Sequence, residues 1–274
     1  FKEKYESKVA KNPYANFIIS DSYLKLGLDK SFERSMKDLE GLRGGQNRVF
    51  PRWVKVHKKI DLNEYLDELK LVKLTRDEKW KEADAFLSQV KDRENINYNY
   101  YKGLVSYRLK KYNEAVKFFE GLLVKPNAKN MLSPLQSLTM LTAYAESLYQ
   151  GNDQERFRTN TAALINDLRR SGAEKRKKAV ERLEYLYIES LNGERKPNNS
   201  LISSKAGEFL KEHEKSSYRD RVKYLRGVSL IKASNQDEGK ALLEELISGT
   251  ETPEYIKGLA RSELSSLTLE NKKL

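Results

Sequence analysis

One stretch constrains the fold of this chain more than any other: residues 100–126, which read YYKGLVSYRLKKYNEAVKFFEGLLVKP. Apolar residues recur at helical spacing on both sides of a polar turn, so the stretch predicts two short amphipathic helices. The small residues Gly103 and Ala115 lie where the two helices must pass close to each other, and Phe119 fills the space beside them. Pro126 ends the second helix, because proline cannot continue the backbone hydrogen-bond ladder. A pair this short cannot bury its apolar face alone, so it requires stacked neighbours.

The start of the first helix occurs three times along the chain, each time as a tyrosine three residues before a glycine. The three copies are Tyr100 with Gly103, Tyr224 with Gly227, and Tyr255 with Gly258. The last two copies are 31 residues apart. A weaker copy at 71–90 has Trp80 three residues before Ala83, which itself lies 32 residues before Ala115. Self-similarity at such a spacing is typical of helical repeat arrays.

The order of these residues resembles the tetratricopeptide repeat (TPR). The matching positions are small Gly103, aromatic Tyr107, Tyr112 three residues before Ala115, and the closing Pro126. The match is closest over 96–126 and 220–265. The resemblance implies an all-α fold, a right-handed superhelical solenoid of antiparallel helix pairs with a concave inner surface.

Hydrophobic periodicity and turn signals along the whole chain predict about twelve or thirteen helices and no strand. The expected ranges are 11–27, 31–42, 61–75, 77–91, 95–110, 112–124, 134–150, 154–170, 173–191, 200–215, 217–233, 236–248 and 253–269, with a further short helix after Pro51. We expect a single array over 1–274. Irregular stacking is expected at 43–60 and at the polar loop 192–199.

The composition narrows the class of protein. The charged fraction of 34% and the hydrophobic fraction of 38% are typical of an elongated array more than of one deep core. Cysteine is absent, which excludes disulfides and thiolate chemistry. No apolar run approaches the length that spans a bilayer. The start at Phe1 and the lack of cysteine suit an exported, processed protein of the bacterial periplasm or envelope, and cytoplasmic repeat scaffolds share both features.

The sequence offers no catalytic constellation. His57 and His213 are far apart, and neither has a second ligand at metal spacing, so we expect no metal site and no cofactor. We therefore expect a protein that is not an enzyme. One enzymatic context stays open: the helical domain of lytic transglycosylases looks similar, and this chain would then be the accessory domain of a trimmed envelope enzyme.

The TPR resemblance implies a function in protein binding through the concave groove. In that family, first-helix residues hold an extended or helical peptide, and the equivalent residues here are Tyr100, Leu104, Tyr107, Arg108, Tyr224, Val228, Ile231, Lys232 and Tyr255. The alternative is that these tyrosines only pack between adjacent repeats. We expect a non-enzymatic scaffold with protein partners, and self-association stays open.

The net charge of +12 supports a second hypothesis, binding of nucleic acid or another anionic polymer. The densest basic run supplies the candidate residues Arg169, Arg170, Lys175, Arg176, Lys177 and Lys178. Glu174 and Glu181 lie within or beside this run, which favours a solvated helix end over an anion-binding patch. Protein binding is therefore the preferred hypothesis.

Overall fold

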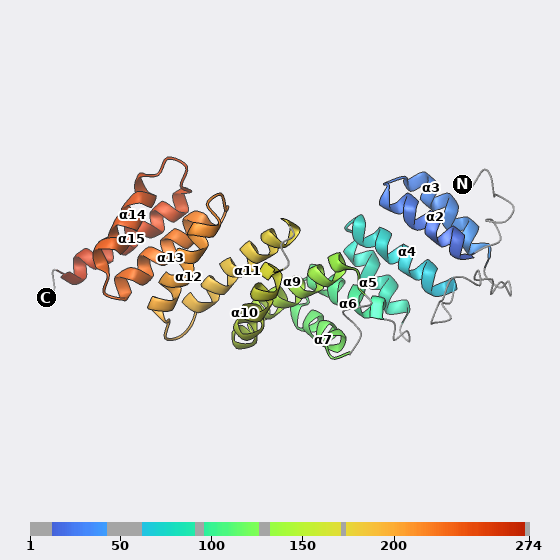
Figure 1. The fold of residues 1–274 in the computed structure, drawn as a ribbon, viewed down its shortest axis with the longest axis horizontal. Coiled ribbons are helices and arrows are strands. Elements are labelled where there is room, and N and C mark those ends of the chain that lie inside the picture. Colours follow the sequence, from blue (N-terminus) through green and yellow to red (C-terminus); the bar gives the residue numbers. More distant parts are fainter. Residues whose placement is uncertain (1–12, 43–61, 91–95, 126–131, 171–173, 272–274) are drawn as a thin grey trace. The chain divides into compact units, whose positions relative to one another are not determined.

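A computed structural model describes residues 13–42, 62–90, 96–125, 132–170 and 174–271 of the chain. Within these ranges the chain forms thirteen α-helices and no strand (Figure 1). The helices are α2 (Pro13–Lys25), α3 (Asp29–Glu40), α4 (Leu62–Arg76), α5 (Trp80–Gln89), α6 (Ile96–Arg108), α7 (Tyr112–Leu123), α9 (Pro134–Gln150), α10 (Gln154–Arg170), α11 (Glu174–Asn192), α12 (Asn199–Glu212), α13 (Arg219–Lys232), α14 (Gln236–Ser248) and α15 (Glu254–Asn271).

The all-helical prediction is confirmed. Each of the thirteen predicted ranges corresponds to one helix, and the largest displacement of an end is three residues, at the start of α5 and at the end of α12. The short helix expected after Pro51 and the irregularity expected at 43–60 lie outside the described residues. Every helix in the described ranges falls short of the length and apolarity needed to cross a bilayer.

The chain divides into two compact units, Phe1–Leu132 and Ser133–Leu274, where one continuous array was expected. The N-terminal unit contains α2–α7 and the C-terminal unit contains α9–α15. The second unit opens with a complete capping box. The Ser133 hydroxyl accepts from the Gln136 N–H, the Gln136 side chain accepts from the Ser133 N–H, and Pro134 occupies the first helical turn.

Within each unit, helices pack against their neighbours and next neighbours in sequence. In the N-terminal unit, α4 contacts both α2 and α6, while α3, α5 and α7 pack beside their own partners. In the C-terminal unit, α11 contacts both α9 and α13, and α13 contacts α15. We call α2, α4, α6, α9, α11, α13 and α15 the first helices. Successive first helices therefore contact one another within each unit.

The same three-residue turn joins five of the helix pairs. Its middle residue has a left-handed backbone, with φ between 56° and 70°, at Gly27, Glu78, Lys110, Asn152 and Ser234. In each turn the next N–H reaches back five residues to a helix carbonyl, as from Lys111 to Ser106 at 2.8 Å and from Asn235 to Leu230 at 2.9 Å. These bonds form the Schellman motif, which satisfies carbonyls at the end of the first helix.

The left-handed residue also fixes which side chains meet. The residue seven positions before it is buried in all five pairs, and these residues are Ser20, Leu71, Gly103, Ala145 and Gly227. The residue five positions after it is buried as well, and these residues are Phe32, Ala83, Ala115, Phe157 and Gly239. The turn therefore sets one register for the five pairs, even where the residue types differ.

The pair α11 and α12 is the exception among the described pairs. Its linker, 193–198, has no residue with positive φ. Instead, the Asn198 side chain caps α12 by accepting from the Leu201 N–H. The core nevertheless continues across this pair, with Ile188, Ile202 and Phe209 each 1% exposed or less. Burial of each such side chain contributes about 1.5–3 kcal/mol.

Candidate functional site

Aromatic and charged side chains gather across three first helices of the C-terminal unit. We call this surface the α9–α11–α13 face, and it consists of Glu146, Tyr149, Arg182, Tyr185, Glu189, Tyr218, Arg221 and Tyr224. All eight are partly exposed. The three helices lie side by side because α11 contacts both α9 and α13. The face therefore extends over three helices instead of belonging to one helix pair.

Helical spacing explains why these side chains share one side. On α11, Arg182, Tyr185 and Glu189 are three and four residues apart, so they project from the same face of the helix. Leu183 and Leu186, in the intervening positions, are 0% and 3% exposed and pack into the core. The spacing of three between Tyr218, Arg221 and Tyr224 has the same consequence at the start of α13.

Arg182 connects the three helices. Its Nε donates to Glu146 Oε1 on α9 at 3.3 Å, and its Nη1 donates to the Tyr218 hydroxyl at 3.2 Å. The rings of Tyr185 and Tyr218 stack with centroids 4.2 Å apart and planes 7° apart, and the guanidinium lies 5.6 Å from the Tyr218 ring centre. Cation–π and stacking contacts of this kind fix the side chains in place.

Glu189 makes the second connection between α11 and α13. Both of its carboxylate oxygens accept from Arg221, at 2.6 Å and 3.1 Å, and its Oε1 also accepts from the Tyr185 hydroxyl at 3.0 Å. Two-point pairing between arginine and a carboxylate is among the stronger polar contacts in proteins. Arg221 also lies 5.4 Å from the centre of the Tyr224 ring.

Burial and charge shift the pKa of several groups on the face. Burial, followed by the nearby Glu189 carboxylate, raises the pKa of Tyr185 to about 12. The same two causes raise the pKa of Tyr149, while burial and Glu263 raise that of Tyr224. The hydrogen bond to Glu189 raises the pKa of Arg221. At neutral pH the face thus carries protonated tyrosines and charged arginines in fixed positions.

Such a surface is suited to protein recognition. Tyrosine and arginine are enriched among the residues that contribute most to binding energy at interfaces. Because these side chains are already held by hydrogen bonds, a partner would pay little conformational entropy to order them. Each arginine is paired with a carboxylate, so the face presents flat rings and guanidinium planes without a large excess of charge.

The structure separates the predicted groove residues into buried and exposed groups. Tyr100, Leu104, Val228 and Ile231 are only 4–7% exposed, so they pack between helices and do not form the partner-contacting surface that was expected. The predicted residues with accessible side chains are Tyr107, Arg108, Tyr224, Lys232 and Tyr255. The first two lie in the N-terminal unit, and the others lie on α13 and α15.

In the N-terminal unit, Arg108 lies against aromatic rings at the end of α6. Its guanidinium is 5.3 Å from the Trp80 ring centre and 5.8 Å from that of Tyr107. The Tyr107 ring in turn lies 6.4 Å from that of Tyr112. This grouping joins α5, α6 and α7.

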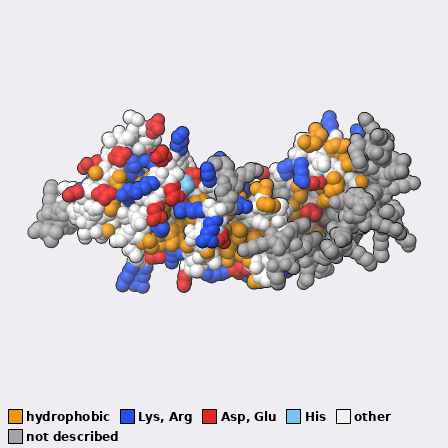
Figure 2. All heavy atoms as spheres, in the orientation of Figure 1, with side chains coloured by type: hydrophobic (Ala, Val, Ile, Leu, Met, Phe, Trp, Pro, Cys, Tyr) orange, Lys and Arg blue, Asp and Glu red, His pale blue; other side chains and the backbone are white. Residues whose placement is uncertain are grey.

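One cation of the predicted anion-binding run, Arg169, is paired with carboxylates. Arg169 Nη2 donates to Glu184 at 2.5 Å and to Glu212 at 2.6 Å. Arg170, Lys177 and Lys178 are exposed and Arg176 is half-buried, whereas the side chain of Lys175 lies outside the described residues. Positive and negative side chains are interspersed over the visible surface of the C-terminal unit (Figure 2). The two carboxylates that pair with Arg169 lie outside the run, so anion binding by the run stays a prediction.

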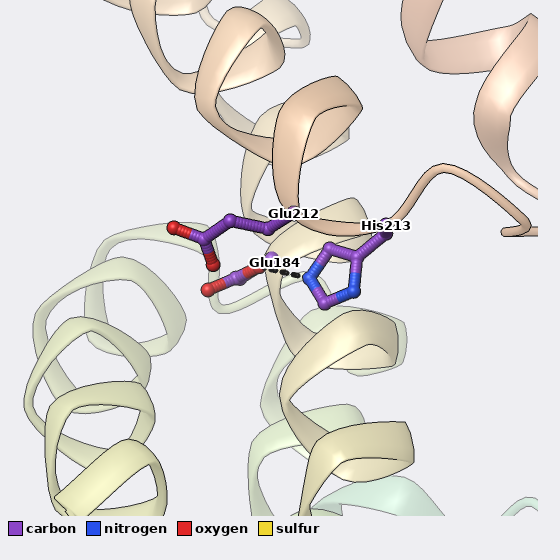
Figure 3. A group of neighbouring side chains, drawn as sticks. All are labelled: Glu184, Glu212 and His213. Carbon is purple, nitrogen blue, oxygen red and sulfur yellow. Dashed lines mark hydrogen bonds and ion pairs between the residues drawn. The ribbon is translucent and has the colours of Figure 1, made fainter.

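Glu184, Glu212 and His213 point toward one another beside Arg169 (Figure 3). His213 Nε2 lies 2.8 Å from Glu184 Oε2, and the imidazole packs 4.7 Å from the Phe209 ring. Two carboxylates and an imidazole are ligands that zinc accepts. Here, however, the Arg169 guanidinium already bridges the two carboxylates, so it offsets part of their charge and links α10, α11 and α12.

A pocket of about 130 Å³ opens next to this group, between α10, α11 and α12. Its lining includes apolar Ile165, Ile188 and Phe209, with Arg169 and Lys205 at the polar side. Lys205 is paired with Glu208 at 2.8 Å, as Arg169 is with its own carboxylates. Pockets for organic cofactors are usually several hundred Å³, so this one is too small for a typical cofactor.

No protein-family model matches the chain, and no curated protein or solved structure shows significant similarity to it.

Most of the α9–α11–α13 face was missed by sequence reasoning, which concentrated on the Tyr-x-x-Gly copies. A signal was present: Glu146, Arg182 and Tyr218 follow one another at intervals of 36 residues and contact one another in that order. The interval is close to the length of one helix pair, so opposite charges at that spacing indicate contact between successive first helices.

Proposed function

We propose that the chain is a non-enzymatic scaffold that binds a partner protein, with the α9–α11–α13 face as the main contact surface. The observation that carries the proposal is the ordered, half-exposed array of tyrosine and arginine across three successive first helices. The partner segment would be an extended or helical peptide whose apolar side chains lie on the tyrosine rings and whose polar groups pair with Arg182 and Arg221.

The arrangement of helices supports a TPR-like architecture within each unit. Five pairs share one turn and one register, and successive first helices contact one another. Repetition of this kind is what a right-handed superhelix of antiparallel pairs would contain, with first helices lining its inner side. A binding surface on α9, α11 and α13 is consistent with that architecture.

The proposal is tested by comparing the partners of two tagged variants with those of the wild-type protein in cells that express it. One variant carries Arg182→Gln and Tyr224→Ser, which change the face. The matched control carries Arg156→Gln on α10, where the ion pair to Asp153 is local, at 3.0 Å. Circular dichroism and thermal unfolding establish that both variants are folded before partners are quantified by mass spectrometry.

We expect specific partners to be depleted from the face variant and retained by the control, since only the first removes contacts from the face. Equal recovery of all partners by the folded face variant would eliminate this surface as the binding site. Loss of the same partners from the control would show that the effect is not specific to the face.

A further inference from the structure

A polar pocket of about 370 Å³ opens where the ends of α9 and α11 meet the start of α10. Its walls come from the turn between α9 and α10, from the last turn of α11 and from the beginning of the 193–198 linker. We call it the linker pocket. It lies beside the pair α11 and α12, whose connection lacks the left-handed turn of the other described pairs.

A connected set of hydrogen bonds holds the inner wall of the linker pocket. Ser190, which is 3% exposed, donates from its hydroxyl to Gln154 Oε1 at 2.8 Å and accepts from Arg158 Nη1 at 3.1 Å. The Nε of Arg158 also lies 3.1 Å from Glu194 Oε1. These contacts join α10, α11 and the linker. Because the wall is already ordered, a polar ligand would bind there with a small entropic cost.

Three polar groups of the lining are not engaged by other parts of the protein. Within the described residues, the Arg195 guanidinium, the Asn152 side-chain amide and the Tyr149 hydroxyl have no hydrogen-bond or ion-pair partner. Burial, followed by the nearby Glu189 carboxylate, raises the pKa of Tyr149, so its hydroxyl keeps its proton at neutral pH. Each of the three groups can therefore donate a hydrogen bond to a bound molecule.

The charges of the lining indicate what kind of molecule fits. Its two carboxylates are already paired, Glu194 with Arg158 at 3.1 Å and Glu189 with Arg221 at 2.6 Å. Arg195 is the remaining charged residue of the lining, so one positive charge stays uncompensated. A single carboxylate group would compensate it, and the planar guanidinium matches a carboxylate with two parallel hydrogen bonds.

We propose that the linker pocket binds a small hydrophilic acid with one carboxylate and several hydroxyl groups. The carboxylate would pair with Arg195, and the hydroxyl groups would bond to Asn152 and Tyr149. Apart from the Tyr149 ring, the lining consists of polar residues and one glycine, which disfavours an apolar ligand. The volume lies within the usual range for ligand pockets, about 300–1,000 Å³.

This site does not depend on partner binding by the α9–α11–α13 face, although Tyr149 and Glu189 belong to both. The test variants are therefore placed outside that face. Arg195→Gln removes the uncompensated charge. Asn152→Gly removes the amide, while glycine still accepts the φ of 63° that the turn requires. The control is Arg170→Gln, the same substitution at an exposed arginine of the same unit that does not line the pocket.

The probes are the sodium salts of gluconate, glucuronate and glycerate, each with one carboxylate and at least two hydroxyl groups. Glucose serves as the neutral counterpart of glucuronate, and inorganic phosphate serves as an oxyanion of higher charge. Isothermal titration calorimetry on the intact protein measures affinity. The NMR signal of the Gly193 amide, which lies in the lining, locates the bound acid. Circular dichroism establishes that each variant is folded.

We expect at least one of the three acids to bind saturably, with a Kd of about 1 mM or tighter, and to shift the Gly193 signal. Arg195→Gln should weaken this binding at least about tenfold, and Asn152→Gly about three- to tenfold. Arg170→Gln should bind like wild type, and glucose should bind at least about tenfold more weakly than the acid.

Four results would overturn the proposal. They are no saturable binding of any of the three acids, equal binding by folded Arg195→Gln, an unchanged Gly193 signal on binding, and tighter binding of phosphate or glucose than of every acid. Loss of binding from Arg170→Gln would assign the acids to the basic run at the end of α10 and would overturn it as well.

Discussion

Gly239 of α14 rests directly on the backbone of Gly227 in α13. A Cβ added to Gly239 would lie 2.6 Å from the Gly227 carbonyl oxygen and 3.0 Å from the Ile231 nitrogen. The two helices cross here at a distance that only glycine permits, because backbone atoms cannot move aside as a side-chain tip can. This contact joins the residue seven positions before the left-handed residue of the turn to the residue five positions after it.

Three glycine-to-alanine substitutions in the C-terminal unit should differ in the sign of their effect on stability. Gly239→Ala should lower the free energy of unfolding by about 2–3 kcal/mol, and Gly227→Ala by about 1–2 kcal/mol, since the Leu243 side chain can shift. Gly258→Ala should raise it by about 0.5–1 kcal/mol, because alanine favours the helix and the space is open. Urea unfolding followed by circular dichroism measures all three. Destabilisation by Gly258→Ala would show that α15 is already covered at this point.

The turn residues offer a second test, in the N-terminal unit. Lys110 has a left-handed backbone with φ of 62°, a conformation that costs a residue with a Cβ about 1–2 kcal/mol. Lys110→Gly should therefore raise the free energy of unfolding by about 0.5–1 kcal/mol after the entropic cost of glycine is subtracted. Lys117→Gly, at an exposed position within α7, should lower it by about 1 kcal/mol. Equal destabilisation by both would mean that the turn at Lys110 is not left-handed.

The sequence predicts a structural property of this protein well when residues of the same segment determine it. Helix ends were predicted well because periodicity, proline and the turn residues are encoded within each segment. The exposure of side chains was not predicted well. Tyr100 and Tyr255 begin the same motif, and yet they are 4% and 65% exposed. Their difference is set by whether another helix packs over them, which the motif does not record. The division after Leu132 likewise depends on contacts between helices.

The register of the α9 and α10 pair is also encoded in the sequence. Ala145 and Phe157 are 12 residues apart, as are Gly103 and Ala115, and both are buried at the equivalent positions. Phe157 occupies the position that the small residue Ala115 has in the α6 and α7 pair. Alignment on the turn, where Asn152 is a residue type that tolerates a left-handed backbone, places this pair in register with the others.

Arg169 and its neighbour Arg170 should contribute unequally to stability. Arg169 bridges Glu184 and Glu212, so its loss leaves two carboxylates close together beside His213. Arg169→Gln should lower the free energy of unfolding by about 1–2 kcal/mol, whereas Arg170→Gln should change it by less than about 0.5 kcal/mol. Thermal and urea unfolding at low salt measure the difference, which high salt should reduce by screening. Identical effects of the two substitutions would contradict the bridging role.

Tyr185 should make the C-terminal unit sensitive to alkaline pH. Burial and the Glu189 carboxylate raise the pKa of this phenol from 10.0 to about 12 in the folded protein. Above about pH 10 the unfolded chain releases the proton before the folded one does, so the free energy of unfolding falls as pH rises toward 12. Below pH 10 both states are protonated and the group contributes no pH dependence. Tyr185→Phe keeps the stacking on Tyr218 and removes this titration, and should therefore make the decline in stability shallower. Urea unfolding of both proteins at about pH 9 and about pH 11 measures the two slopes, and equal slopes would show that Tyr185 titrates alike in both states.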